Sequence, residues 1–265
     1  MNRLLLTGFL LMILAAARAG DFRLIKTLPM PVNEFSVDIL GQIYWAEGST
    51  LYRYNPATDE KIEYSNAFLG DIHSWDASNP LKILVFHKDY NTLVFIDKNL
   101  SQIRSPIPLD QLGINQAGAC CTSRDGGFWV INQTTRQLQQ YDASLQLRQE
   151  SPMLAELNTR SDTKPLIREQ NGNLYAALPN CCALIFDRFG NLVRRNPLKN
   201  VNNIQILNQN IYYFYEGDLF KLNQDLHHTE SIPLPRVDEE WINAKMGTRN
   251  MLYLLKDQEL YIYES

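Results

Sequence analysis

The sequence predicts an all-β protein, a six-bladed β-propeller with four antiparallel strands in each blade. Three observations predict it: a strand motif recurs six times, its copies are nearly evenly spaced, and turn-forming residues separate the strands within each copy. Each copy ends a run of aromatic and β-branched residues with Asp, Asn or Glu. The six endings are Tyr54-Asn55, Ile96-Asp97, Tyr141-Asp142, Phe186-Asp187, Leu222-Asn223 and Tyr263-Glu264, separated by 42, 45, 45, 36 and 41 residues. A period near forty residues with several strands per repeat is typical of propeller blades.

Turn-forming residues set the strand boundaries inside the repeats. In the second unit we expect strands at residues 72–76, 82–87, 93–97 and 101–106. The third unit begins with a strand at 120–123, followed by the turn Arg124-Asp125-Gly126-Gly127. Asp-Gly and Asn-Gly pairs between apolar runs favour hairpins because they tolerate a positive φ.

The two ends of the chain are expected to meet in one blade. The sixth unit stops at the close of its third strand and so has no outer strand of its own. Residues 22–28 resemble the outer-strand segments of other units, such as residues 230–235. We therefore expect residues 22–28 to complete the last blade, which closes the ring and leaves no open sheet edge.

The first nineteen residues have the pattern of a secretory signal peptide. Asn2-Arg3 form a short basic region, residues 4–17 are an apolar run of fourteen, and Ala17-Arg18-Ala19 offers small residues to a signal peptidase. The run is shorter than the roughly 20 residues that a membrane-spanning helix needs. We expect cleavage after Ala19, export without a transmembrane anchor, and a single domain over residues 20–265.

The mature chain is mildly acidic. Removing Arg3 and Arg18 lowers the 25 basic residues to 23 against 29 acidic ones, a formal net charge of −6. A negative surface does not attract the phosphate backbone, so we expect no nucleic-acid partner. The 246 remaining residues divide into 41 per repeat, a natural size for a four-stranded blade.

The four cysteines form two adjacent pairs, Cys120-Cys121 and Cys181-Cys182. Two adjacent cysteines do not easily coordinate the same metal ion, because metal ligands are usually separated by a few residues. An oxidising compartment permits disulfides, so one bond between the two pairs, across neighbouring blades, is one expectation. Four reduced and buried thiols are the alternative. A bond within an adjacent pair is the least favoured of the three arrangements.

Polar residues at the predicted inner strands are the candidate ligand-binding groups, because they would border the central channel. Turn formation is the competing role for the two aspartates, since Asp commonly accepts hydrogen bonds from nearby backbone amides. Glu169 and Gln205 lie in comparable stretches. The candidates are Asp38, His73, Asp76, Arg168 and Lys245.

Enzyme signatures are missing from the sequence. It has no Gly-x-Ser-x-Gly elbow, no His-Glu-x-x-His, and no phosphate-binding or dinucleotide-binding fingerprint. Lactonase-type propellers hold a divalent metal with acidic and Asn side chains in the channel, an arrangement that this chain imitates only loosely. We predict no cofactor, no metal site and no catalytic residues. The residues of this chain that loosely match such a metal-binding set are Glu34, Asp76, Asn203 and Asn243.

Two segments carry a resemblance to a known group of proteins: residues 75–86, with the sequence WDASNPLKILVF, and residues 121–130, with the sequence CTSRDGGFWV. With the six repeats, they resemble uncharacterised, exported propeller-like proteins of Bacteroidota, and more distantly the NHL and related six-bladed families. The resemblance implies the fold, export, and a location in a Gram-negative periplasm or cell envelope. It implies no activity and assigns no catalytic residue.

Two functions remain open from the sequence. The first is a non-enzymatic binding or scaffold module that presents the loops of one face to an envelope protein or a small ligand, a task suited to rigid blades with variable loops. The alternative is a metal-assisted hydrolase or lactonase that acts in the central channel.

Overall fold

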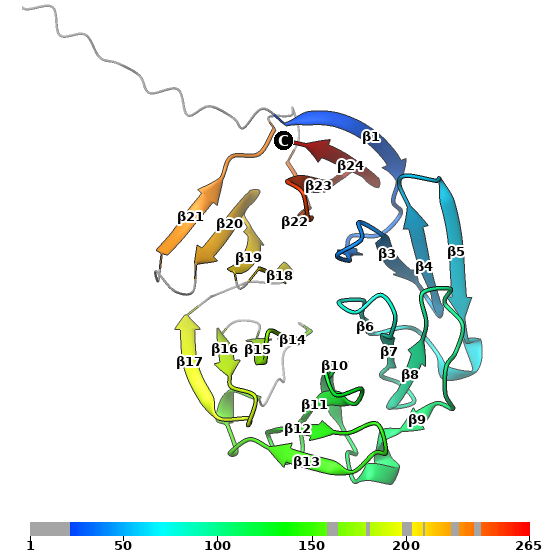
Figure 1. The fold of residues 1–265 in the computed structure, drawn as a ribbon, viewed down its shortest axis with the longest axis vertical. Helices are drawn as coiled ribbons and strands as arrows, with labels where there is room; N and C mark the ends of the chain where they lie inside the picture. The colour runs from blue at the N-terminus through cyan, green and yellow to red at the C-terminus, as the bar shows by residue number, and fades with distance from the viewer. Residues whose placement is uncertain are drawn as a thin grey trace, which may run out of the picture.

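The computed structural model describes residues 22–157, 164–178, 181–197, 203–208, 210–223, 228–235 and 240–265. The predicted signal peptide at 1–19 lies outside the described residues, as does His227. Six four-stranded antiparallel sheets are arranged in a ring, which confirms the predicted six-bladed propeller (Figure 1). In the described part of the chain, no helix is long and apolar enough to cross a membrane.

Five blades are built from consecutive strands, and the first strand of each lies nearest the ring's centre. Blade 1 contains β2 (Ser36–Val37), β3 (Ile43–Glu47), β4 (Thr50–Asn55) and β5 (Glu60–Ser65), and blade 2 contains β6 (Ser74–Asp76), β7 (Ile83–His87), β8 (Thr92–Ile96) and β9 (Ile107–Pro108). Blade 3 contains β10 (Ala117–Thr122), β11 (Phe128–Asn132), β12 (Gln137–Tyr141) and β13 (Leu147–Glu150), and blade 4 contains β14 (Leu166–Gln170), β15 (Asn173–Leu178), β16 (Cys182–Phe186) and β17 (Leu192–Pro197). Blade 5 contains β18 (Asn203–Leu207), β19 (Asn210–Tyr215), β20 (Asp218–Asn223) and β21 (His228–Ile232).

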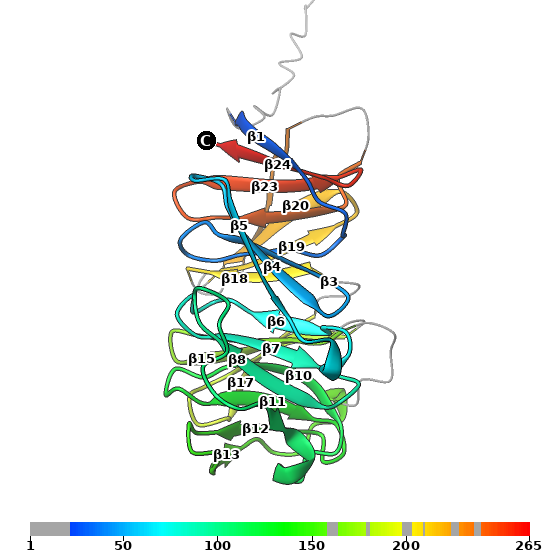
Figure 2. The ribbon, with the colours of Figure 1, turned by 90° about the vertical axis from the view of Figure 1, so that its right-hand side faces the viewer.

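Blade 6 joins the two ends of the chain. It contains β22 (Asn243–Met246), β23 (Met251–Lys256) and β24 (Glu259–Glu264), and its outer strand is β1 (Arg23–Pro29). The register runs antiparallel from Arg23 opposite Glu264 to Pro29 opposite Glu259. Both views show β1 lying along β24 (Figure 2). The predicted closure of the ring by the amino-terminal strand is therefore confirmed.

Apolar side chains fill the space between neighbouring blades. In β7, Leu84 and Phe86 pack against blade 3, whereas Ile83 and Val85 pack against blade 1. Successive side chains of a strand point to opposite faces of its sheet, so each central strand supplies two interfaces at once. Each of the six junctions has its own cluster of buried residues, which explains why these strands read as continuous apolar runs.

The aspartates that end the repeated motif form tight turns. Asp97, Asp142 and Asp187 each accept two backbone hydrogen bonds on Oδ1, from the amides two and four residues later, at 2.8 and 2.9 Å. The same geometry in three blades explains why Asp recurs at the end of the third strand. These aspartates connect the third strand to the outer strand.

The predicted outer strand of blade 2 at residues 101–106 was wrong. That segment makes only an isolated bridge between Ile96 and Gln102 and a hydrogen bond from Ile103 N to Phe95 O at 3.0 Å. The outer strand is β9, paired through Thr92 and Leu93. Pro106 has no N–H to donate to a strand ladder, which interrupts the pairing before β9.

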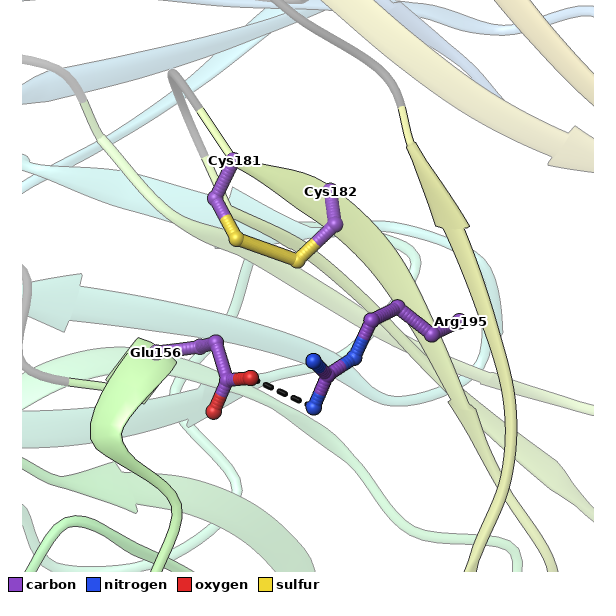
Figure 3. The surroundings of a disulfide bond; sticks show 4 residues. All are labelled: Glu156, Cys181, Cys182 and Arg195. Atoms are coloured by element: carbon purple, nitrogen blue, oxygen red, sulfur yellow. Dashed lines mark ion pairs between the residues drawn. A yellow bond between two sulfur atoms is a disulfide. The ribbon is translucent and has the colours of Figure 1, made fainter.

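The expected disulfide between the two cysteine pairs was also wrong, because Cys181 is bonded to its neighbour Cys182 (Figure 3). Cys120 and Cys121 are free and buried. Cys121 lies one residue before the end of the inner strand β10, whereas Cys182 begins β16, the third strand of blade 4. Both residues belong to the buried cluster between blades 3 and 4, but β10 ends at one face of the ring and β16 begins at the opposite face.

An ion pair lies beside this disulfide. Glu156, in the short 3-10 helix η3 (Ala155–Leu157) before blade 4, contacts Arg195 of β17 (Figure 3). The carboxylate is more covered than the guanidinium, with 19% and 53% of their side chains exposed. The pair connects the segment before blade 4 to the outer strand of that blade.

Peptide mapping under non-reducing conditions tests the cysteine assignment. Trypsin cuts after Arg168 and Arg188, which places Cys181 and Cys182 in one peptide. We expect the mass of that peptide to be two hydrogen atoms below the mass of its reduced form. After the protein is unfolded, the peptide should not react with iodoacetamide, whereas Cys120 and Cys121 should be alkylated. A peptide from blade 3 joined to one from blade 4 would contradict the assignment.

Candidate functional site

The ring has two faces that carry different loops. We call the front face the one formed by the loops that join the first to the second strand and the third to the fourth strand of each blade. The back face carries the loops between second and third strands and the connections between blades. The two sets lie on opposite sides because neighbouring strands run antiparallel.

Four of the five candidate residues gather at the front end of the central channel. Asp38 follows β2, Asp76 ends β6, and Arg168 and Lys245 lie near the ends of β14 and β22. A cavity of about 90 Å³ is lined by Asp38, Arg168 and Lys245, and Arg168 connects it to Asp76. His73 lies three residues before Asp76, about 10 Å towards the back face at 3.3 Å per residue.

Asp38 forms a turn and is fully engaged by protein donors. Its Oδ1 accepts hydrogen bonds from Leu40 N at 2.8 Å and Gln42 N at 2.9 Å, and its Oδ2 accepts one from Tyr44 Oη at 3.0 Å. Burial raises the pKa of the Asp38 carboxyl, and these donors act against that rise. Asp38 therefore matches the competing turn interpretation.

Asp76 connects three blades. Its Oδ1 accepts a hydrogen bond from Ser78 N at 2.8 Å, which is the expected turn bond. Its Oδ2 accepts bonds from both the amide and the hydroxyl of Thr122, in blade 3, each at 2.8 Å. Arg168, in blade 4, forms an ion pair with Oδ1. Asp76 is 1% exposed, so the charge of its carboxylate is balanced by Arg168 inside the protein.

Lys245 is a buried cation at the channel cavity. Its side chain lines the cavity, the residue is 8% exposed, and Nζ donates one hydrogen bond to Ile204 O at 3.2 Å. No acidic group in the described part of the chain lies within ion-pair distance of it. Burial lowers the pKa of Lys245, Glu34 raises it and Arg168 lowers it, and the net result is a pKa of about 8.

Replacing Lys245 with Met is expected to stabilise the fold. The pKa of Lys245 is about 8 in the folded state, against an ordinary 10.5, so burying the charge costs about 3 kcal/mol below pH 8. Loss of the hydrogen bond to Ile204 reduces the stability gained by removing this charge by about 1 kcal/mol. The net gain of about 2 kcal/mol should raise the Tm by roughly 4–8 °C at pH 7.

The gain should shrink as the pH rises from 8 to 10.5. In this window the unfolded chain binds more protons than the folded one, so the stability of the wild type rises with pH relative to the variant. Thermal melts of both proteins at pH 7 and pH 10 measure this, with the exposed Lys98→Met as the control. A lower Tm for Lys245→Met at pH 7 would contradict the assignment.

Other polar bonds tie neighbouring inner strands together. Glu169 Oε2 accepts hydrogen bonds from Ser123 Oγ and Trp129 Nε1, each at 2.8 Å, and so connects blades 3 and 4. Gln205 Oε1 accepts one from Met246 N at 2.9 Å, which connects blades 5 and 6. These roles explain two of the residues that the sequence placed near the channel.

A second polar group lies at the back end of the channel. Lys164 Nζ donates to His73 O at 2.9 Å and lies 3.4 Å from Glu34 Oε2. The imidazole of His73 packs edge-on against Phe86, and its Nε2 is buried without a hydrogen bond. Burial, with Lys164 and Lys88 nearby, lowers the pKa of His73 to about 4, so the ring is neutral at pH 7. The sequence did not single out Lys164, because it lies 91 positions from His73 and only folding brings the two together.

The four residues that resemble a lactonase metal set have different surroundings. Glu34 contacts Lys164, Asp76 contacts Arg168, and Asn243 Nδ2 donates to Asn33 O at 3.1 Å. The side chain of Asn203 lies outside the described residues. No group of three or more His, Cys, Asp or Glu residues that could hold a metal ion occurs in the described ranges.

Two larger cavities open on the front face beside the channel. One, of about 420 Å³, lies between blades 3 and 4 and is lined by Arg124, Arg148, Arg188 and Phe189 among others. The other, of about 450 Å³, lies above the inner strands of blades 2, 3 and 4. Both are lined in part by Glu169, which also lines the channel cavity, so the three hollows adjoin one another.

The comparisons with known proteins support the fold and leave the function open. No protein-family model matches the sequence, and no curated protein matches it. Among solved structures, a streptogramin B lyase has a TM-score of 0.58 at 10% identity, over 92% of this chain and 97% of that one. A protein of unknown function from Bacteroides caccae has a TM-score of 0.56 at 12% identity, over 80% and 82% of the two chains. A chain of the mitotic checkpoint complex has a TM-score of 0.56 at 12% identity, over 100% and 99%.

These similarities concern the overall fold alone, because only 10–12% of the residues are identical. The three solved proteins are an enzyme, a protein of unknown function and a member of a protein complex. The fold therefore does not choose between catalysis and binding, and a functional argument has to come from the site.

Proposed function

We propose that this protein is an exported, non-enzymatic binding module whose front face receives its ligand or envelope partner. The observation that carries the proposal is the set of three adjoining hollows on that face, centred on a channel mouth with a buried cation, Lys245. A concave, mostly preformed site with a few converging polar groups is the usual form of a binding pocket. The signal-like residues 1–19 and the resemblance to exported propeller-like proteins of Bacteroidota support the periplasm or cell envelope as its location.

Two of the exposed apolar residues on the front face line the cavities described above. Large apolar side chains are exposed on both faces: Ile39 (54%) and Phe189 (59%) on the front, and Phe68 (91%) and Tyr90 (60%) on the back. Scattered exposed apolar residues are normal on soluble proteins. The two front residues, however, line cavities, Ile39 at the channel and Phe189 between blades 3 and 4.

Matched variants of the two faces test this proposal. The immobilised wild-type protein, the front double variant Ile39→Asp/Phe189→Asp and the back double variant Phe68→Asp/Tyr90→Asp would be exposed to envelope extract from the source organism. We expect a partner that the wild type and the back variant retain and the front variant loses. If the front variant retains the partner and the back variant loses it, binding takes place on the back face and the proposal is wrong.

A further inference from the structure

We propose that the channel cavity binds the carboxylate group of a small organic acid, with Lys245 and Arg168 as its cationic contacts. This inference rests on the proposed binding role of the front face. It adds the chemical class of the ligand and the atoms that recognise it.

The two cations have free hydrogen-bonding capacity. An ammonium group has three N–H donors, and Lys245 uses one of them, on Ile204 O. A guanidinium group has five, and Arg168 directs Nη1 to Asp76. Both side chains line the same cavity. In the described residues no further acceptor is hydrogen-bonded to either group, so an anion that entered would find several unused donors.

The carboxylates around the same cavity do not compete for these donors. Both oxygens of Asp38 accept hydrogen bonds from backbone amides and Tyr44. Glu169 is held by Ser123 and Trp129, towards the junction of blades 3 and 4. Their charges are therefore stabilised by several donors each, whereas Lys245 has one hydrogen bond and no carboxylate within ion-pair distance among the described residues. A buried charge without a partner is costly, and an incoming anion would relieve that cost.

The size and walls of the cavity point to a carboxylate on a short apolar chain. A volume of about 90 Å³ holds roughly three water molecules at about 30 Å³ each, enough for a carboxylate and a few carbon atoms. Drug-sized ligands need roughly 300 Å³ or more. Apolar side chains supply much of the wall, which suits hydrocarbon better than the oxygens of phosphate. These residues are Val37, Leu166, Ile206, Leu207 and Met246.

Calorimetric titration with butyrate tests the proposal, with its neutral isostere butyramide and inorganic phosphate as comparison probes at constant ionic strength. At pH 7 we expect butyrate to bind the wild type and Lys98→Met, and to bind Lys245→Met at least tenfold more weakly. Butyramide should also bind the wild type at least tenfold more weakly. Arg168 is not used as the test variant, because its loss also leaves the buried carboxylate of Asp76 without its ion-pair partner.

Three results would overturn the proposal. Equal binding of butyrate and phosphate would indicate a general anion site. Equal binding to wild type and Lys245→Met would place the acid elsewhere. If butyrate does not bind but Lys245→Met abolishes capture of an envelope partner, the occupant is a carboxylate of that partner and not a small acid. In that last case the proposed binding role of the front face still stands although this inference fails. The same holds whenever the front double variant loses the envelope partner.

Discussion

Deletion of residues 22–29 is expected to remove the cooperative folding of the whole ring. Strand β1 supplies the outer edge of blade 6, and Leu28 packs in the buried cluster between blades 6 and 1. Without it, β24 becomes an open edge and the two ends of the ring are no longer held together. We expect a loss well above the roughly 4 kcal/mol that single substitutions seldom exceed, because a whole strand is removed. Thermal unfolding followed by circular dichroism measures it.

A rearranged chain provides the positive control. Arg23 lies opposite Glu264 in the register, so a two-residue turn can join β24 directly to β1. The chain 30–264, then the turn, then 23–29, should recover most of the lost stability. Arg23→Ala should have little effect, because its ion pair with Glu264 is largely exposed and such pairs contribute about 0–1 kcal/mol. A deletion that melts within about 2 °C of the wild type would show that β1 does not close the ring.

Replacement of Arg168 with Met is expected to destabilise the protein by about 3–5 kcal/mol, because it leaves the carboxylate of Asp76 buried and unpaired. This corresponds to a fall in Tm of roughly 6–20 °C for a domain of this size. Burial lowers the pKa of Arg168 only to about 10, so the guanidinium is charged at pH 7 and the pair is ionic. Chemical denaturation of wild type and variant gives the difference.

A double-mutant cycle assigns the loss to the pair. Asp76→Asn removes the charge but keeps an acceptor for Thr122, so Asp76→Asn/Arg168→Met should be more stable than Arg168→Met alone. Arg188→Met, an exposed arginine on the same face, should change the stability by less than about 0.5 kcal/mol. Strict additivity of the two substitutions would mean that Asp76 and Arg168 do not interact.

The sequence predicted the propeller well because each blade repeats local signals. Asp97, Asp142 and Asp187 end the third strand in the same way, and each accepts the same two amide hydrogen bonds. The closure by β1 was also predictable, since a short last unit and an unassigned first strand complement each other. The outer strand of blade 2 was not, because a strand at the edge is weakly constrained by pattern and Pro106 shifted its pairing.

The sequence predicted which residues border the site but not which of them contact one another. Asp38 and Asp76 carry local turn signals that were recognised. Their other contacts depend on distant segments: Asp76 meets Thr122 and Arg168, which are 46 and 92 positions away. Only the folded ring reveals that no carboxylate of the described residues lies within ion-pair distance of Lys245. The bond between Cys181 and Cys182 was disfavoured because adjacent cysteines seldom pair, and no pattern in the sequence indicated the exception.

The pKa of Lys245 is the most direct test of the central claim that the front end of the channel is a site for an anion. It can be followed by NMR of the ¹³Cε resonance in protein labelled at lysine, assigned by comparison with Lys245→Met. Arg168, Glu34, Asp38, Glu169 and Tyr253 are the charged and titratable groups around the site, and they are the same in every titration. We predict a pKa of about 8 that rises in butyrate and is unchanged in butyramide. An ordinary pKa near 10.5, unaffected by butyrate, would show that Lys245 is solvated and that the site does not exist.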